Sequence, residues 1–241
     1  MREDLVKKFN KFYPRLYSLR PRIECQGPKE HIKYLDFHKK RYLQTIKILD
    51  RLGCNPSSRV LEIGVAYLSI LIKEVFGCEI HGIDRHFGYQ KILEEYNIPL
   101  KQCNLLKNQI PYFGGFDFVL LCEVLEHLPM PPIELFEKLR KVVGEGFLLI
   151  TTPNLTALAK RLKLLLGKSP LDIFKITPYG EYTHLREYTL NELVNCLEDS
   201  GYQIVQKNII QSWKHRLDII FSFFYFFPSL RDNLFIVAKL K

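Results

Sequence analysis

The sequence lacks any apolar run long enough to cross a membrane. Its longest apolar run, 219–227, is interrupted by Ser222 and followed by Pro228, so it has about half of the roughly 20 residues that a membrane-spanning helix needs. The first 22 residues carry charges throughout and contain no apolar core segment, unlike a secretory signal. We therefore expect neither a transmembrane helix nor a signal peptide.

The sequence also lacks paired cysteines, internal repeats and low-complexity tracts. Its six cysteines are scattered, and no two of them have the C-x-x-C spacing. Such a distribution indicates neither a structural zinc site nor a disulfide framework. A reducing compartment fits these free thiols, and we expect a cytoplasmic protein.

Positive charge is concentrated at the N-terminal end. The 241 residues include 35 Lys+Arg and 26 Asp+Glu, a formal charge of +9. Residues 1–51 hold 14 Lys/Arg and 6 Asp/Glu, a net of +8, which leaves 21 minus 20, or +1, for the remainder. This basic segment attracts phosphate on nucleic acid, on a nucleotide-linked substrate or on an anionic membrane, and charge alone does not choose among them. The alternative is a solvated helix face that keeps the protein soluble.

The apolar residues that are present, 47% of the chain, are sufficient for a globular core. Helical spacing covers 31–52, and from residue 59 onward short apolar runs alternate with amphipathic stretches. The predicted strands are 60–63, 79–83, 99–103, 116–121 and 147–151, and the predicted helices between and after them are 68–76, 89–96, 133–143 and 190–200. Nearly continuous apolar strands separated by helices indicate a parallel α/β sheet covered on both faces. The strands expected at 202–210 and 234–240 follow each other without a long helix, which predicts an antiparallel edge hairpin.

Residues with binding chemistry follow the first two predicted strands. In an open parallel sheet, ligands bind outside the carboxyl ends of the strands where strand order reverses. Gly64 follows the first strand and allows the backbone to turn sharply and approach a ligand. Asp84 ends the second strand, 20 residues later, a spacing that suits a carboxylate bound to a ribose diol. A strand-terminal aspartate that only caps a helix is the alternative.

Five segments together carry a resemblance to a known family. They are VLEIGVAYLSI at 60–70, Asp84, FDFVLLCEVLEHLP at 116–129, GEGFLLITTPN at 144–154 and HLREYTLNELVNCLEDSGYQIV at 184–205. With them, residues 55–241 resemble a class I S-adenosylmethionine-dependent methyltransferase. The resemblance implies a Rossmann-like, doubly wound, mostly parallel seven-stranded sheet with an antiparallel terminal hairpin. It also implies S-adenosylmethionine as the cofactor.

The resemblance assigns cofactor-binding roles along these segments. The methionine end of the cofactor would border the first strand end, the ribose would lie at the second, adenine would lie after the third, and the transferred methyl would lie after the fourth. The residues in that order are Glu62, Gly64 and Ala66; Asp84; Asn104 and Leu105; and Leu121, Cys122 and Glu123. The glycine loop departs from the family, because Ala66 and Leu68 replace glycines and we expect Tyr67 and Leu68 to crowd the cofactor. A protein that has lost the cofactor and serves as a binding partner is therefore one alternative.

The EVLEH segment carries the candidate catalytic side chains. His127 and His184 are the candidate general bases, because an imidazole titrates near neutrality. Together with Glu123 and Glu126 they match the residue types of a divalent-metal site in ubiquinone-type O-methyltransferases and small-RNA 3′-end methyltransferases. The same turn also occurs in relatives that use no metal, and we expect none here. Arg186 is expected either to clamp an acidic acceptor or to pair with Glu187 at the surface.

We expect a single methyltransferase domain over 1–241, with a basic helical extension at 1–55 and acceptor-site insertions at 155–188 and 211–231. Both insertions combine basic residues with large apolar ones, which suits a cover over an acceptor pocket and peripheral contact with a membrane. Ordinary core packing of the aromatics is the alternative. The predicted reaction is methylation, at oxygen, of a small-molecule or lipid- or saccharide-linked acceptor. RNA methylation is the alternative that the basic extension permits, although no RNA-binding module is recognisable.

Overall fold

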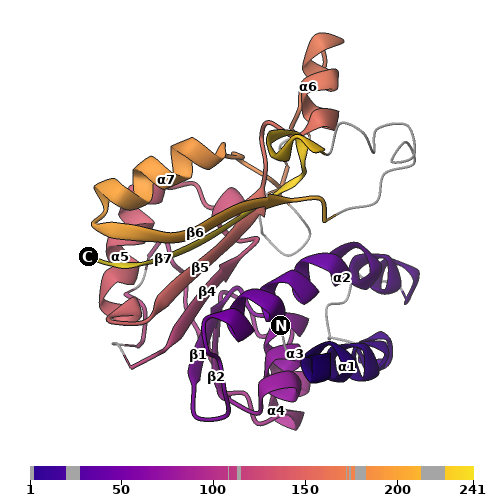
Figure 1. The fold of residues 1–241 in the computed structure, drawn as a ribbon, viewed down its shortest axis with the longest axis vertical. Coiled ribbons are helices and arrows are strands. Elements are labelled where there is room, and N and C mark those ends of the chain that lie inside the picture. Colours follow the sequence, from indigo (N-terminus) through magenta and orange to yellow (C-terminus); the bar gives the residue numbers. More distant parts are fainter. Residues whose placement is uncertain are drawn as a thin grey trace.

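Seven strands form one sheet in the order β3-β2-β1-β4-β5-β7-β6 (Figure 1). The structure is a computed structural model that describes residues 3–19, 28–107, 109–112, 115–171, 173, 175–176, 183–212 and 226–241. The strands are β1 (Arg59–Ile63), β2 (Glu79–Asp84), β3 (Leu100–Gln102), β4 (Phe118–Cys122), β5 (Phe147–Pro153), β6 (Tyr202–Ile210) and β7 (Asn233–Leu240). The predicted Rossmann-like, mostly parallel fold is confirmed.

The last strand in the chain is not at the edge of the sheet. The pairs β1–β2, β1–β4, β2–β3 and β4–β5 are parallel, whereas β7 runs antiparallel to both β5 and β6. The antiparallel hairpin predicted from the sequence is therefore present, but of its two strands only β6 lies at an edge of the sheet. β7 lies inside the sheet, and seven of its eight residues are at most partly exposed, with a continuous buried run from Asn233 to Ala238.

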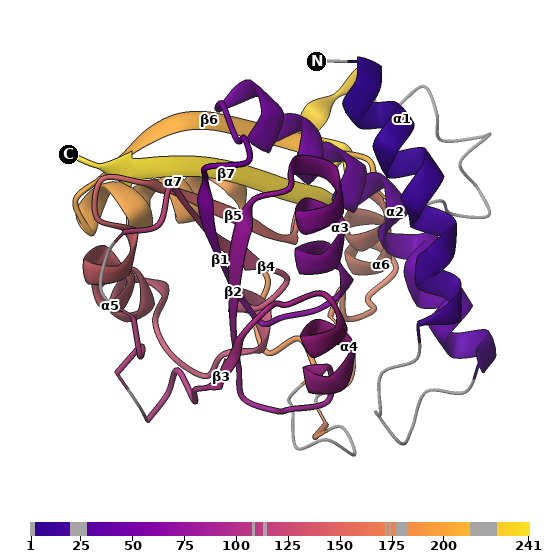
Figure 2. The ribbon, with the colours of Figure 1, turned by 90° about the horizontal axis from the view of Figure 1, so that it is seen from below.

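Helices cover both faces of the sheet (Figures 1 and 2). One hydrophobic cluster joins the sheet to α1, α2, α3 and α4, and a second joins it to α5 and α7. The helices are α1 (Glu3–Phe12), α2 (Pro28–Arg51), α3 (Tyr67–Phe76), α4 (Gln90–Glu95), α5 (Pro132–Val143), α6 (Leu158–Leu165) and α7 (Leu190–Asp199), with short 3₁₀ turns at η1 (Tyr13–Ser18), η2 (Leu125–His127) and η4 (Pro228–Leu230). The N-terminal helices thus contribute to the core on the α3 side.

Local sequence signals explain where the elements begin and end. In β4, Phe118 and Leu120 belong to the first cluster and Val119 and Leu121 to the second, because successive strand residues point to opposite faces. α7 starts at a capping box in which Thr189 accepts a hydrogen bond from the Glu192 amide and the Glu192 side chain accepts one from the Thr189 amide, an arrangement that satisfies two otherwise unpaired donors. The observed bounds differ from the predicted ones by three residues at most.

α6 projects away from the sheet (Figure 1). It follows β5 and falls within the predicted insertion at 155–188. Most of the second predicted insertion, 211–231, lies outside the described residues, including Trp213, Phe221, Phe223, Phe224 and Tyr225. No helix in the described ranges has both the length and the apolar content that crossing a bilayer requires.

Candidate functional site

The candidate site lies at the carboxyl ends of β1, β2, β4 and β5. The chain passes from β1 outward to β2 and β3 and then returns to the other side of β1 as β4. Ligand-binding crevices of open α/β sheets form at such a reversal of strand order. Each residue that the sequence predicts for the cofactor lies near the carboxyl end of one of these strands or, for Asn104 and Leu105, of the neighbouring strand β3.

Gly64 makes the turn after β1 in a conformation that other residues rarely adopt. Its φ angle is 76°, and a Cβ atom placed on it would lie 2.4 Å from Cγ2 of Val124. Its amide donates to the Ile83 carbonyl at 2.9 Å, which ties the loop to β2. A glycine is therefore required here both by the backbone angle and by the space.

The rest of the loop needs no glycine. Ala66 is the residue before α3 and has an extended backbone, with φ at −143°. Tyr67 and Leu68 do not crowd the cofactor region, contrary to the prediction, because both side chains are buried in the core. The Tyr67 hydroxyl bonds to the Leu19 carbonyl at 3.2 Å. The loop substitutions thus leave the ligand side of the turn clear of these side chains.

Glu62 is buried in β1 and accepts a hydrogen bond from the Ser69 hydroxyl of α3. Burial raises the pKa of the Glu62 carboxyl to about 8, although the Ser69 bond and the charge of Arg41 oppose the rise. A carboxyl group in this state fixes the start of α3 against the end of β1. This contact between β1 and α3 also holds the loop of Gly64 in place.

Asp84 joins the ends of β1 and β2. Its Oδ2 accepts a hydrogen bond from the Val65 amide at 3.0 Å, and its Oδ1 accepts one from the His86 amide at 2.8 Å. A carboxylate has about four lone-pair sites in all, so it can accept bonds from hydroxyls as well as from amides. The carboxylate therefore has a fixed orientation beside the Gly64 loop.

Asn104 and Leu105 lie next to Asp84 after β3. The Cys103 amide donates to the Asp84 carbonyl at 2.8 Å. Asn104 is half-buried and its Oδ1 accepts the Leu106 amide at 3.0 Å, and Leu105 is buried. The two residues assigned to the adenine end are thus beside the residue assigned to the ribose.

Glu123 occupies a strained position directly after β4. Leu121 and Cys122 are buried in the strand, and Glu123 then has a φ angle of 56°, a left-handed conformation that costs a non-glycine residue about 1–2 kcal/mol. Its Oε1 accepts hydrogen bonds from Thr151 Oγ1 at 2.9 Å and from Asn233 Nδ2 at 3.1 Å. β5 and β7 therefore hold this carboxylate at the edge of the site.

Arg41 reaches the same carboxylate from the N-terminal helix α2. Its side chain is buried, and Nη1 lies 4.0 Å from Glu123 Oε1. Nε and Nη2 lie 3.2 and 3.0 Å from Nδ1 of His38. Burial and, to a smaller extent, the charge of Arg41 together lower the pKa of the His38 imidazole to about 2, so this ring is a neutral acceptor. The sequence analysis missed Arg41, although Tyr34, His38, Arg41 and Thr45 form one helical stripe that signals a polar buried face.

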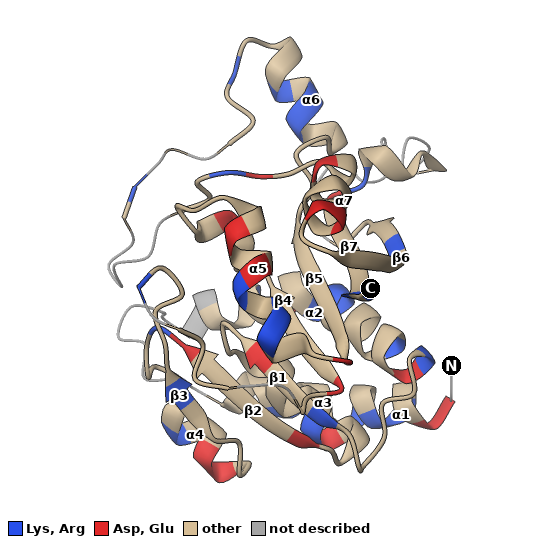
Figure 3. Ribbon diagram, turned by 90° about the vertical axis from the view of Figure 1, so that its left-hand side faces the viewer, with Lys and Arg blue, Asp and Glu red and all other residues tan. Residues whose placement is uncertain are grey.

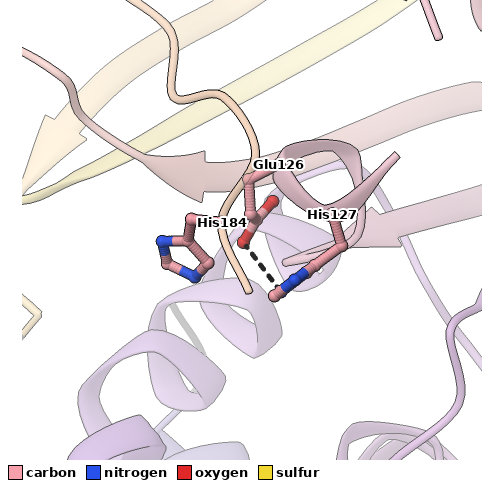
Figure 4. A group of neighbouring side chains, drawn as sticks. All are labelled: Glu126, His127 and His184. Carbon is pink, nitrogen blue, oxygen red and sulfur yellow. Dashed lines mark ion pairs between the residues drawn. The ribbon is translucent and has the colours of Figure 1, made fainter. Parts of the chain in front are cut away.

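Glu126, His127 and His184 gather at one point beyond β4 (Figure 4). The Leu185 amide donates to the Glu126 carbonyl at 2.8 Å, which brings the 183–188 segment across the η2 turn. The two imidazole centroids are 4.9 Å apart, and Figure 4 shows the Glu126 carboxylate between the rings. The predicted candidate bases are therefore neighbours.

The Glu126 carboxyl is buried, but only one of its two oxygens has a hydrogen bond in the described part of the chain. Oε2 accepts a hydrogen bond from Thr152 at 2.9 Å, whereas the buried Oε1 has no hydrogen-bond partner among the described residues and lies 3.9 Å from Nε2 of His127. Burial raises the pKa of Glu126 to about 8, and repulsion by Glu123 adds to the rise. One ligand-type atom from each of Glu126, His127 and His184 lies within 4.8 Å of the others, so these three can hold a cation. The Glu123 carboxylate, which the sequence grouped with them, is instead bonded to Thr151 and Asn233.

Glu187 orients His184. Its Oε1 lies 3.0 Å from Nδ1 of His184, and its Oε2 accepts a hydrogen bond from the Lys160 ammonium. Burial alone would lower the pKa of His184, but the Glu187 bond and the charges of Glu126, Glu187 and Glu123 outweigh it and raise the pKa. The surface pair predicted between Arg186 and Glu187 is wrong, because Glu187 is buried and Arg186 pairs with Glu192. No sequence pattern signals the Lys160–Glu187–His184 chain, because it depends on the start of α6 packing against the segment of His184 and Glu187.

Comparisons with known proteins agree with this geometry. Residues 37–207 match a family model described as a methyltransferase domain. A curated relative, the mitochondrial ubiquinone biosynthesis O-methyltransferase of Schizosaccharomyces pombe, is 34% identical over 89 residues, which are 37% of this chain and 31% of that protein. The match therefore spans less than a third of the relative's length.

Solved structures share the fold at low sequence identity. The magnesium protoporphyrin IX methyltransferase of Synechocystis PCC 6803, with bound SAH, is similar with a TM-score of 0.61 and 16% identity, covering 96% of this chain and 94% of that one. An S-adenosylmethionine-dependent methyltransferase of Mesorhizobium loti has a TM-score of 0.54 and 13% identity, covering 80% of this chain and 96% of that one.

Proposed function

The chain belongs to the class I S-adenosylmethionine-dependent methyltransferases, and from this premise we propose that it methylates a hydroxyl oxygen of a small-molecule or lipid-linked acceptor. The observation that carries the proposal is the His184 imidazole, oriented by the buried Glu187 carboxylate at the edge of the cofactor crevice. A base of this kind serves an acceptor that must lose a proton, as a hydroxyl does.

The described residues fit the cofactor. Gly64 turns the backbone sharply at the end of β1, packed too closely against Val124 for a Cβ, and Asp84 presents a fixed carboxylate for the ribose hydroxyls. We assign Glu62, Ala66, Asn104, Leu105, Leu121, Cys122 and Glu123 to the lining of the same crevice. S-adenosylmethionine, when bound, supplies a methyl group on a positively charged sulfur.

Arg41 adds a cation to this crevice. Its guanidinium is buried near the ends of β4 and β5, and its nearest carboxylate oxygen in the described residues, on Glu123, is 4.0 Å away. A buried guanidinium with a neutral imidazole as its closest acceptor is suited to a further carboxylate. We assign Arg41 to the carboxylate of the amino-acid end of the cofactor.

His184 receives the proton of the acceptor. Glu187 holds Nδ1 as the protonated nitrogen, which leaves Nε2 free to accept the hydroxyl proton. The negative charge of Glu187 then stabilises the imidazolium that forms. His127, with 36% of its side chain exposed, lines the entrance beside it and serves as the second candidate base.

The acceptor class is inferred from chemistry and from the relatives. The curated relative is named for O-methylation in ubiquinone biosynthesis, and one solved relative is named a geranyl diphosphate methyltransferase. These names support a small acceptor, with or without an apolar tail. RNA remains the alternative, because α1 and α2 carry exposed lysines.

A metal-assisted reaction is the second candidate, and the unpartnered buried Oε1 of Glu126 favours it. Glu126, His127 and His184 would hold the ion, which would lower the pKa of an acceptor hydroxyl. Glu187 would then orient a ligand instead of a base.

The test combines binding and turnover. We expect the purified protein to bind S-adenosylhomocysteine in a calorimetric titration and to transfer a radiolabelled methyl group to members of a panel of phenols and isoprenoid phenols. Cofactor binding without transfer to hydroxyls, but with transfer to RNA, would overturn the acceptor assignment. The absence of any cofactor binding would favour a non-catalytic protein.

A further inference from the structure

Exposed apolar side chains gather at one end of the molecule. Of the twelve exposed large apolar residues among those described, five belong to the end of α6 and to the segment before η4: Leu164, Leu165, Leu166, Phe226 and Phe227, with exposed fractions from 56% to 81%. We call this region, with Arg161, Lys163 and Lys168, the α6 tip. We propose that the α6 tip docks on the surface of an anionic lipid bilayer.

Hydrogen bonds join the two chain segments that carry the tip, just before α6 and at η4. Nδ2 of Asn154 donates to the Ser229 carbonyl at 3.1 Å and to the Arg231 carbonyl at 2.7 Å, and the Thr156 hydroxyl donates to the Ser229 carbonyl at 3.2 Å. At the first turn of α6, Lys160 is buried against Glu187. The apolar side chains are therefore presented on an anchored support.

The charge of the tip has one sign. Residues 155–171 include four basic residues and no acidic one, and Figure 3 shows only Lys and Arg among the charged residues of α6. Lys163 and Lys168 are exposed next to the leucines. Basic heads beside exposed carbon are complementary to a surface of phosphate groups over acyl chains.

The arrangement of the leucines favours lipid over a protein groove. Leu164, Leu165 and Leu166 are consecutive, so around the helix end they project about 100° apart. A protein groove binds residues three and four apart that share one face. A bilayer surface accepts apolar groups in all of these directions, because acyl chains are fluid. If the end of the short helix α6 inserts into the bilayer, all three leucine side chains can contact acyl chains.

Docking would also orient the proposed active site relative to the bilayer. Lys160 in the first turn of α6 contacts Glu187, which in turn holds His184, so the helix that carries the tip starts beside the residues of the proposed base. An acceptor embedded in the bilayer by an apolar tail would reach the crevice from this side. That consequence rests on the proposed function, whereas docking itself does not.

The test is sedimentation of the protein with sucrose-loaded vesicles of phosphatidylcholine alone or mixed with phosphatidylglycerol. We expect binding to the mixed vesicles, at least about tenfold weaker binding to phosphatidylcholine alone, and weakening by salt. Leu164→Ser with Leu165→Ser and Leu166→Ser should lower binding about tenfold or more. Lys163→Glu with Lys168→Glu should remove the preference for the anionic lipid.

The matched control removes exposed apolar surface elsewhere. Ile32→Ser with Val205→Ser changes two exposed residues outside the tip and should leave vesicle binding unchanged. S-adenosylhomocysteine binding by each variant reports that it is folded. Equal losses in control and tip variants, no sedimentation of the wild type with anionic vesicles, or binding abolished by millimolar inorganic phosphate alone would overturn the proposal. So would tip-dependent self-association in sedimentation velocity without vesicle binding, which would assign the tip to a second copy.

A second assay, which measures methyl transfer to an acceptor in solution without vesicles, tests the proposed function separately from bilayer docking. A triple-serine variant that ignores vesicles but retains this transfer supports docking as a distinct role. A wild type that binds anionic vesicles but transfers no methyl group supports docking and contradicts the proposed reaction.

Discussion

His184 Nδ1 lies 3.0 Å from Oε1 of the buried Glu187, so this carboxylate holds one ring nitrogen. In the proposed reaction the other nitrogen accepts the proton of the acceptor. The pair resembles the base–orienter arrangement of hydrolytic triads in geometry, although the nucleophile here belongs to the substrate. Because Glu187 raises the pKa of His184, the pair also sets the pH at which the base becomes neutral.

Glu187→Gln tests this coupling through the pH profile. A base acts when neutral, so kcat should rise with pH through the pKa of His184, which lies above the usual 6.5. The glutamine keeps the shape but loses the charge, so the acidic limb should move to lower pH while kcat at its plateau falls about tenfold or more. Since the substitution leaves the buried Lys160 ammonium without its carboxylate partner, Glu187→Gln with Lys160→Met is the stability control. An unchanged limb in both variants would show that Glu187 is only structural.

Asp84→Ala should weaken cofactor binding. Loss of hydrogen bonds from the ribose hydroxyls to a carboxylate costs about 1.5–3 kcal/mol, or roughly 10- to 150-fold in Kd. The measurement is calorimetric titration with S-adenosylhomocysteine. Glu79→Ala is the matched control, because Glu79 begins the strand that Asp84 ends and its side chain is 53% exposed. If the two variants bind S-adenosylhomocysteine with equal affinity, Asp84 does not bind the ribose hydroxyls.

Arg41→Gln should reduce affinity for the cofactor more than affinity for adenosine, which lacks the amino-acid end. A charge-assisted pair contributes about 1.5–3 kcal/mol, so we expect at least a tenfold rise in Kd for S-adenosylhomocysteine. Arg51→Gln at the exposed end of the same helix is the control. Parallel losses for both ligands would indicate that Arg41 supports the fold of the site without binding the carboxylate.

Gly64→Ala and Gly77→Ala separate backbone strain from steric conflict. Both glycines have positive φ angles, 76° and 72°, but a Cβ meets Val124 at 2.4 Å in the first case and nothing within 4 Å in the second. The free energy of unfolding, measured with urea, should fall by about 1–2 kcal/mol for Gly77→Ala and by a further 1–3 kcal/mol for Gly64→Ala. Adding Val124→Ala to Gly64→Ala should recover part of the difference. Similar losses at both positions would contradict the close packing of the loop.

Turnover is expected to survive treatment with a chelator. Only three ligand-type groups meet in the described part of the site, and burial favours the protonated, neutral form of Glu126 near pH 7. The assay measures methyl transfer before and after EDTA, with Mg²⁺ or Mn²⁺ added back. Loss of activity that the metal restores would assign Glu126, His127 and His184 as ligands.

Much of the fold could be predicted because the core strands and their helices leave regular apolar patterns. The ends of β1, β2 and β4 could also be predicted, since Glu123 follows a continuous apolar run and Gly64 and Asp84 directly follow shorter strands with buried apolar residues. The neighbours of Glu187 were not, because they depend on a backbone bond between Leu185 and Glu126 and on the start of α6. Arg41 was read as part of a basic surface, although the course of α2 across the sheet buries it.

The position of β7 inside the sheet has a consequence for how the chain folds. β7 pairs with β5 from Pro153 to Asn233, a separation of 80 residues, and β6 pairs with no strand except β7. Closing so long a loop costs entropy before any contact compensates for it. We expect the five parallel strands to assemble first, with β6 and β7 docking later as a preformed hairpin. A ribosome-bound chain that stops before β7 would therefore expose the edge of β5, and this edge is where a chaperone or a misfolded neighbour would pair.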